Sequence, residues 1–105
     1  MIKLEPIPLY EKWFVSQSRE VRVYIAIALN KVKLGNTSKC EYVRDGIYEI
    51  KIHFGKGVRV YYIKETNTLY RLIWGGADKK GQPADIKKAL AIKQYIGNRD
   101  EKQKE

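Results

Sequence analysis

The sequence is poor in the residues that make cross-links, metal sites and membrane spans. Its 105 residues include one cysteine, Cys40, and one histidine, His53. A single cysteine cannot form a disulfide within the chain, and no Cys/His set exists for a structural zinc. No apolar run approaches the ~18–20 residues of a membrane span, and the first residues lack a signal peptide's apolar core. We therefore expect a cytoplasmic protein that needs no metal or other cofactor and no membrane.

Charge is abundant and mostly positive. The chain has 21 Lys and Arg against 12 Asp and Glu, a net charge of +9. Residues 47–96 hold ten basic and four acidic side chains, so +6 of the excess lies there, whereas residues 97–105 are neutral. A basic, folded domain needs an anionic partner, either nucleic acid or an acidic protein.

Length and composition favour one folded domain. A chain of 105 residues falls in the usual size range of a single domain, and its 44% hydrophobic content argues against disorder. No linker or repeat interrupts residues 1–96, which we expect to form the domain. We expect residues 97–105 to form a charged, disordered tail.

The N-terminal third predicts a strand and two helices. A short edge strand ends at Pro6, and a helix that starts at Pro8 has Trp13 and Phe14 as core anchors. Ser18 is an N-cap for a second helix, which Gly35 ends. Its apolar stripe has helical spacing: Val21, Ile25, Ala28, Leu29 and Val32. We expect the two helices to form a hairpin.

The remainder predicts strands and a last helix. Short or alternating segments at residues 40–43, 47–54, 58–64 and 69–74 are typical of strands joined by tight turns. Pro83 opens a C-terminal helix that runs to about Ile96. The expected fold class is α+β: a mainly antiparallel curved sheet, backed by the helix hairpin and completed by the last helix.

The hairpin around Gly55-Lys56-Gly57 predicts a basic patch. If these three residues form the loop, His53 faces Arg59 and Lys51 faces Tyr61, all on the sheet face away from the N-terminal helices. Such a patch is either a phosphate site or an ordinary solvated sheet face. In the first interpretation Arg59 clamps a phosphate, Lys51 neutralises charge, and Tyr61 stacks on a base or donates a hydrogen bond.

Without metal, this patch suits ribonuclease chemistry. Such an enzyme needs a base for the ribose 2′-hydroxyl, cations for the phosphorane and an acid for the 5′-oxygen. His53 or Lys51 could be the base, and Arg59 with Lys79 could stabilise the charge. A tyrosine or a second basic group could be the acid.

Residues 47–62 also carry a family resemblance, with their acidic-apolar-basic strand, Gly-x-Gly turn and Arg-x-Tyr strand. Trp74-Gly75-Gly76, a basic loop with Gln82, and Asp85-Ile86 follow in the same order. Residues 2–96 thus resemble the RelE/ParE toxin superfamily, and within it the HigB-like addiction module killer proteins. Lys51 stands where that branch usually has arginine, and the loop before Gln82 has one extra residue near Ala77.

The resemblance implies a toxin of a type II toxin–antitoxin system that cleaves mRNA, in many members on the ribosome. Its partners would be RNA and a helix-turn-helix antitoxin. The expected catalytic residues are Lys51, His53, Arg59 and Lys79, and the expected RNA contacts are Tyr61, Lys56, Arg71 and Lys80. Two alternatives stay open. The chain could inhibit DNA gyrase by binding, as the ParE branch does, or it could be a basic interaction module without toxicity.

Overall fold

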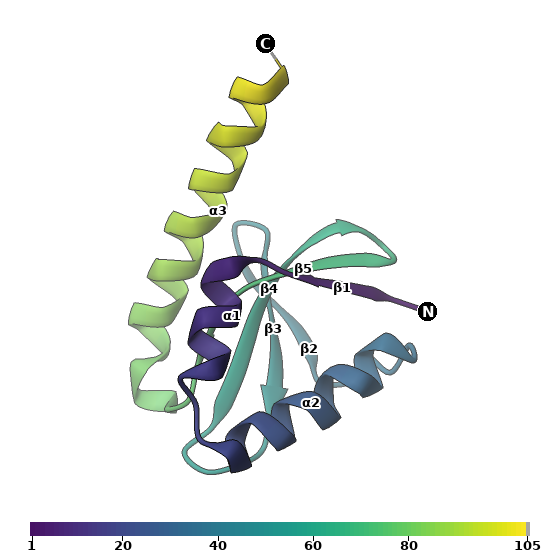
Figure 1. Cartoon of the computed structure of the whole chain (residues 1–105), viewed down its shortest axis with the longest axis vertical. Coiled ribbons are helices and arrows are strands. Elements are labelled where there is room, and N and C mark those ends of the chain that lie inside the picture. Colours follow the sequence, from purple (N-terminus) through teal and green to yellow (C-terminus); the bar gives the residue numbers. More distant parts are fainter. Residues whose placement is uncertain (105) are drawn as a thin grey trace.

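The protein folds around one five-stranded sheet with the strand order β1-β5-β4-β3-β2 (Figure 1). This computed structural model describes the backbone of residues 1–104 and the side chains of residues 1–98. β1 pairs with β5 in parallel, and the other neighbours are antiparallel. The elements are β1 (Lys3–Pro6), α1 (Pro8–Val15), α2 (Arg19–Lys33), β2 (Cys40–Arg44), β3 (Ile47–Ile52), β4 (Val58–Thr66), β5 (Leu69–Gly76), the 3-10 turn η1 (Lys79–Gly81) and α3 (Gln82–Lys104). The expected α+β class, with β1 at a sheet edge, is confirmed.

Local signals set the bounds of the first two helices. Pro8 is the first residue of α1, where its missing N–H costs nothing. The Ser18 side chain caps α2 by accepting a hydrogen bond from the Val21 N–H at 3.2 Å. Gly35 follows α2 with φ of +96°, a conformation that glycine adopts readily. These three expectations from the sequence are confirmed.

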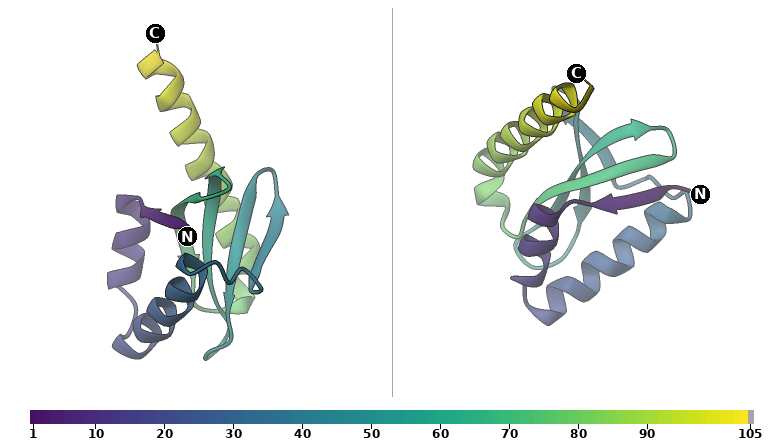
Figure 2. Two further views of the ribbon diagram at one scale, coloured as in Figure 1. Left: turned by 90° about the vertical axis from the view of Figure 1, so that its right-hand side faces the viewer. Right: turned by 45° about the horizontal axis from the view of Figure 1, so that its top comes forward.

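The helices cover both faces of the sheet (Figure 2). α1 packs against β5, and α2 packs across β1, β3 and β4 on the same face. The two helices diverge from the turn that joins them (Figure 1), so each covers its own part of the sheet. α3 packs against β4 and β5 on the opposite face. The face that the sequence analysis treats as open is therefore partly covered.

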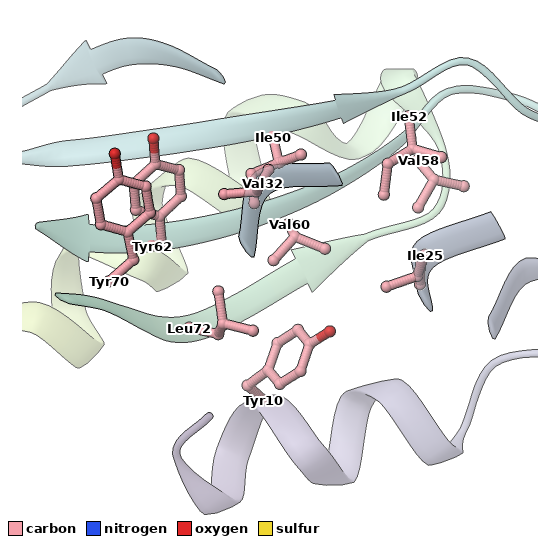
Figure 3. Close-up of a cluster of buried hydrophobic side chains, with 10 residues drawn as sticks. All are labelled: Tyr10, Ile25, Val32, Ile50, Ile52, Val58, Val60, Tyr62, Tyr70 and Leu72. Atoms are coloured by element: carbon pink, nitrogen blue, oxygen red, sulfur yellow. The ribbon is translucent and has the colours of Figure 1, made fainter. Parts of the chain in front are cut away.

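Each face has its own apolar cluster. The larger lies under α1 and α2, where Tyr62 and Tyr70 stack with ring centroids 4.6 Å apart (Figure 3). Tyr10 rather than Trp13 or Phe14 is the buried residue of α1, and the other two pack at the margin. The smaller cluster lies under α3: Ile47, Tyr61, Ile73, Ala89 and Ile92.

The pairing of β3 with β4 corrects the expected register. Ile52 pairs with Val58 and Lys51 pairs with Arg59, so the loop spans residues 53–57 rather than 55–57. Two backbone hydrogen bonds close this wider loop: the Phe54 N–H donates to the Ile52 carbonyl (2.9 Å), and the Gly57 N–H donates to the Phe54 carbonyl (3.1 Å). A shift of two residues keeps the paired side chains of β3 and β4 on their expected faces but changes their partners, and it leaves His53 and Phe54 in the loop.

The C-terminal helix is longer than the sequence predicts. Its backbone continues beyond Ile96 to Lys104 and extends past the sheet (Figure 1). The side chains after Asn98, and all of Glu105, lie outside the described residues. The division into a domain at 1–96 and a disordered tail at 97–105 therefore stays a prediction. Among the described helices, none has the length and apolarity needed to cross a membrane.

Close packing at Gly75 provides a test of this fold. A Cβ atom on this buried glycine of β5 would collide with the Trp13 ring of α1. We expect Gly75→Ala to lower the free energy of unfolding by about 1–3 kcal/mol through overpacking, measured by urea unfolding. Gly97→Ala is the control, because that position on α3 has open space around it. An equal loss in both variants would contradict the packing of α1 on β5.

Candidate functional site

The candidate site lies at the end of β4 that follows the 53–57 loop. Arg59 is its centre and has Lys51 of β3 on one side and Gly76 of β5 on the other. Because side chains alternate along a strand, Tyr61 and Glu49 share this face. The structure thus keeps Lys51 with Arg59, as expected, and adds a carboxylate from the middle of β3.

Glu49 and Arg59 form a nearly buried ion pair. The Arg59 Nε lies 3.2 Å from the Glu49 Oε2, and the side chains are 12% and 5% exposed. The contact is ionic rather than a well-aligned hydrogen bond, since the buried Arg59 Nε has no correctly oriented acceptor. Gln82 at the start of α3 also donates to the Glu49 Oε2, at 3.2 Å. Glu49 therefore joins β3, β4 and α3 at the site.

Sequence reasoning places Glu49 on this face but gives it no role. The available signal is an acidic residue within the apolar strand Ile47–Ile52, two positions from Lys51. In an isolated strand that pattern equally fits a solvated carboxylate. Its burial involves residues distant in the sequence, since Arg59 of β4 and Gln82 at the start of α3 both lie against its carboxylate.

Tyr61 is a buried residue of β4, two positions from Arg59. Its side chain is fully buried and its hydroxyl has no hydrogen-bond partner. Burial is the main reason that the pKa of Tyr61 is raised, the carboxylates of Glu49 and Asp85 raise it further, and Arg59 opposes them. The prediction that Tyr61 stacks on a base is wrong for this conformation, because the ring is covered.

Lys79 and Arg59 converge across Gly57. A Cβ built on Gly57 would lie 3.3 Å from the Lys79 Cβ and 3.7 Å from the Arg59 Nη1. Gly57 has φ of +95°, so glycine suits the position on both counts. The Lys79 N–H also donates to the Lys56 carbonyl at 2.9 Å, which ties the 53–57 loop to η1.

Lys56 and Lys80 extend this basic surface. With Asp78 and Lys79 they line a shallow depression of about 430 Å³. Asp78 shapes the turn, since its Oδ1 accepts a hydrogen bond from the Lys80 N–H at 2.9 Å. Three of the expected residues, Lys56, Lys79 and Lys80, are thus neighbours in space.

Lys51 has a carboxylate partner of its own. Its Nζ lies 2.7 Å from the Oε2 of Glu41 on β2. The hydrogen bond and the charge of Lys51 lower the pKa of Glu41, so that carboxylate is ionised at neutral pH. The side chain of Lys51 therefore lies on the β2 side of Arg59.

Two expected residues do not pair with Arg59. His53 was predicted to face Arg59, but β3 ends at Ile52 and His53 lies exposed in the loop. Arg71 pairs with Ile63, four positions along β4 from Arg59, roughly 13 Å at ~3.3 Å per residue. Its Nε lies 3.4 Å from the Glu65 Oε1.

Asp85 positions the start of α3 beside the site. Its carboxylate fills the space that a side chain on Gly76 would occupy. Burial raises the pKa of Asp85, and the nearby Trp74 indole acts in the opposite direction. Gly76 and Asp85, which lie nine positions apart in the sequence, thus hold the two ends of the loop that carries Lys79.

Buried tyrosines make stability sensitive to alkaline pH. Burial raises the pKa of Tyr10, Tyr61 and Tyr62, so the folded chain keeps protons that the unfolded chain loses above about pH 10. The free energy of unfolding should therefore fall as the pH rises through that range. We expect Tyr61→Phe to reduce this fall in urea unfolding at successive pH values, and the exposed Tyr95→Phe to leave it unchanged. Equal pH profiles for the two variants would contradict the environment of Tyr61.

Comparison with known proteins supports the fold and identifies one relative. No family model matches the chain. A chain of the E. coli RelBE toxin–antitoxin complex superposes with a TM-score of 0.60 at 17% identity, covering 75% of this chain and 99% of that one. This likeness supports the RelE-like fold that the resemblance implies. An uncharacterised protein of Haemophilus influenzae is 32% identical over 98 residues, which span 91% of this chain and 97% of that protein. The chain has a RelE-like fold and belongs to the same family as this Haemophilus influenzae protein.

Proposed function

We propose that this chain is the toxin of a type II toxin–antitoxin system and that it cleaves mRNA without a metal. The observation that carries the proposal is the convergence of Arg59 and Lys79 over Gly57, with Glu49 behind Arg59. The Cβ atom of Lys79 and the Nη1 atom of Arg59 both lie beside Gly57. A lysine and an arginine that start this close together can bind one phosphate between them. The RelE-like fold and the HigB-like sequence order support the same function.

The Glu49 carboxylate orients Arg59 for this task. It lies beside the Nε atom, while Nη1 lies on the side of Gly57 and Lys79. A guanidinium held in this way presents a preorganised donor to a phosphate oxygen. Preorganised charge is worth most where water is largely excluded, as around this 12% exposed side chain.

The chemistry would proceed by attack within the RNA strand. A base takes the proton of the ribose 2′-hydroxyl, and the 2′-oxygen forms a bond to phosphorus. The P–O5′ bond then breaks, the 5′-oxygen receives a proton from an acid, and a 2′,3′-cyclic phosphate is left. Arg59 and Lys79 would stabilise the negative charge that builds on the phosphorane oxygens, with Lys51 adding positive charge.

The proton acceptor is a separate question from the charge stabilisation. His53 lies in the exposed loop, whereas the Glu49 carboxylate and the Lys51 amine flank Arg59. We assign the acceptor role to the Glu49 carboxylate because it lies 3.2 Å from the Arg59 Nε, and we assign Lys51, which pairs with Glu41, to charge stabilisation. We therefore place His53 outside the catalytic group.

The positive charge of this chain also suits a second, acidic partner. The net charge of +9 suits both RNA and an acidic protein segment. We propose a helix-turn-helix antitoxin encoded beside this chain as the second partner. The ribosome is the proposed place of cleavage, since translated mRNA is the substrate of many toxins that this sequence resembles.

Substitutions at Arg59 and Lys79 test the proposed site. Arg59→Lys keeps the charge beside Glu49 but loses the guanidinium fork, whereas Arg59→Ala would leave Glu49 buried and unpaired at a cost of about 3–5 kcal/mol. We expect Arg59→Lys and Lys79→Ala each to reduce RNA cleavage about 100-fold or more, as loss of a charge-stabilising donor does. The measurement is mapping of RNA 5′ ends after brief induction, together with growth.

Matched controls separate the site from general charge loss. Arg44→Lys alters an exposed arginine at the end of β2, and Lys12→Ala removes an exposed lysine on α1. Both should cleave as wild type does, and circular dichroism should show that all four variants fold. Undiminished cleavage by Arg59→Lys and Lys79→Ala would refute the site. Growth arrest with intact mRNA and lost supercoiling would instead favour inhibition of DNA gyrase.

The position of His53 generates a separate expectation. If His53 were the base, its loss would lower the rate by about 100-fold or more. We expect His53→Ala to keep cleavage within about twofold of wild type, because the histidine lies in the loop and not beside Arg59. Glu49→Gln is the companion variant and should lose most activity. The reverse outcome would restore His53 to the catalytic group.

A further inference from the structure

A second concave surface lies on the face of the sheet that α2 covers. It is a groove of about 300 Å³ between α2 and the end of β3. Ile50 and Ile52 of β3 and Ala28 of α2 make its apolar floor. We call it the α2–β3 groove. Its border includes Lys51, so it adjoins the site around Arg59 without being part of it.

The groove exists because β2 is shorter than β3 at this end of the sheet. Cys40, the first residue of β2, pairs with Ile50, and one more bond joins the Lys51 N–H to the Lys39 carbonyl at 2.9 Å. Among the strands that the structure describes, only β4 pairs with Ile52. The edge beside Ile52 is therefore uncovered, and α2 forms the facing wall.

That wall presents large apolar side chains to solvent. Ile27 is 50% exposed and Tyr24 is 42% exposed, and both line the groove. The Tyr24 ring stacks on Phe54 of the 53–57 loop, with centroids 4.1 Å apart and planes 12° apart, so the wall is supported. Apolar surface gathered around a concavity is typical of a protein-binding site.

The charge around the groove has one sign. Lys31, Lys39 and Lys51 border it, and none of the lining residues is Asp or Glu. Glu41 neutralises part of the charge of Lys51 but does not line the groove. An occupant that matches this surface has apolar side chains for the floor and acidic side chains for the rim.

We propose that the α2–β3 groove binds an acidic, amphipathic segment of the antitoxin, an inference that rests on the proposed function. The segment buries apolar side chains against Ile27 and Ile52 and places carboxylates near Lys31 and Lys39. At the Lys51 end, its acidic groups lie beside Arg59 and compete with the RNA phosphate. RNA suits the groove less well, because its phosphates would use the rim and leave the apolar floor uncovered.

Ile27→Glu tests this proposal. It places a carboxylate on an exposed position of the wall, so the fold should persist while the groove becomes unfavourable for an acidic segment. The probe is the protein encoded by the reading frame adjacent to this chain's gene, titrated against the full chain by calorimetry. We expect Ile27→Glu to weaken binding at least about 100-fold, since an unpaired charge is desolvated against apolar surface. Leu9→Glu on α1 is the matched control and should bind as wild type does.

Charge reversal at the rim provides a second measurement. Lys31→Glu combined with Lys39→Glu should weaken binding and reduce its dependence on salt, whereas Lys12→Glu on α1 should change neither. In cells, Ile27→Glu should still arrest growth when induced alone, but the neighbouring protein should no longer rescue it. Toxicity retained and neutralisation lost is the expected pattern.

Each other result decides against the inference or against the proposed function. If Ile27→Glu binds the neighbouring protein as tightly as wild type does, the groove is not the binding site of that protein. If wild type cleaves RNA but does not bind that protein, the inference is also wrong, whereas the ribonuclease function is supported. If Ile27→Glu loses binding to oligouridylate instead, the groove is an RNA-binding site and the inference is wrong. Wild type that binds the protein but cleaves no RNA refutes the ribonuclease and not the groove.

Discussion

The contact between Glu49 and Arg59 constrains the rest of the candidate site. A carboxylate that is 5% exposed and a guanidinium that is 12% exposed each need the other, because an unpaired charge at such burial is strongly destabilising. Their pairing links β3 to β4, and Gln82 adds the start of α3 through the same carboxylate. The start of α3, which directly follows η1, is therefore tied to the two strands that carry Glu49 and Arg59.

The two faces of the sheet have different roles. The face under α1 and α2 holds the larger apolar cluster, which consists of tyrosines and aliphatic residues. The opposite face has the smaller cluster under α3, and there Arg59 keeps 12% of its side chain exposed while Lys79 is exposed. Stability and the proposed chemistry are thus placed on different sides of the same strands, and β3 and β4 serve both.

Glycine has two uses around the site. Gly57 adopts a positive φ and leaves room where Lys79 and Arg59 converge. Gly76 leaves room for the Asp85 carboxylate, and Gly75 leaves room for the Trp13 ring. The first glycine shapes the proposed phosphate site directly, whereas the other two allow α1 and α3 to approach β5. A side chain at any of the three would move an element on which the site depends.

The sequence by itself determined the element order, the Ser18 cap, the end of α2 at Gly35 and the face on which Lys51 and Arg59 lie. Capping and strand alternation are local rules, so they can be read from neighbouring residues. Only the tertiary structure decided the β3–β4 register, the position of His53 in an exposed loop and the burial of Glu49 and Tyr61. These depend on how the 53–57 loop closes and where α3 packs, and those contacts join residues far apart in the chain.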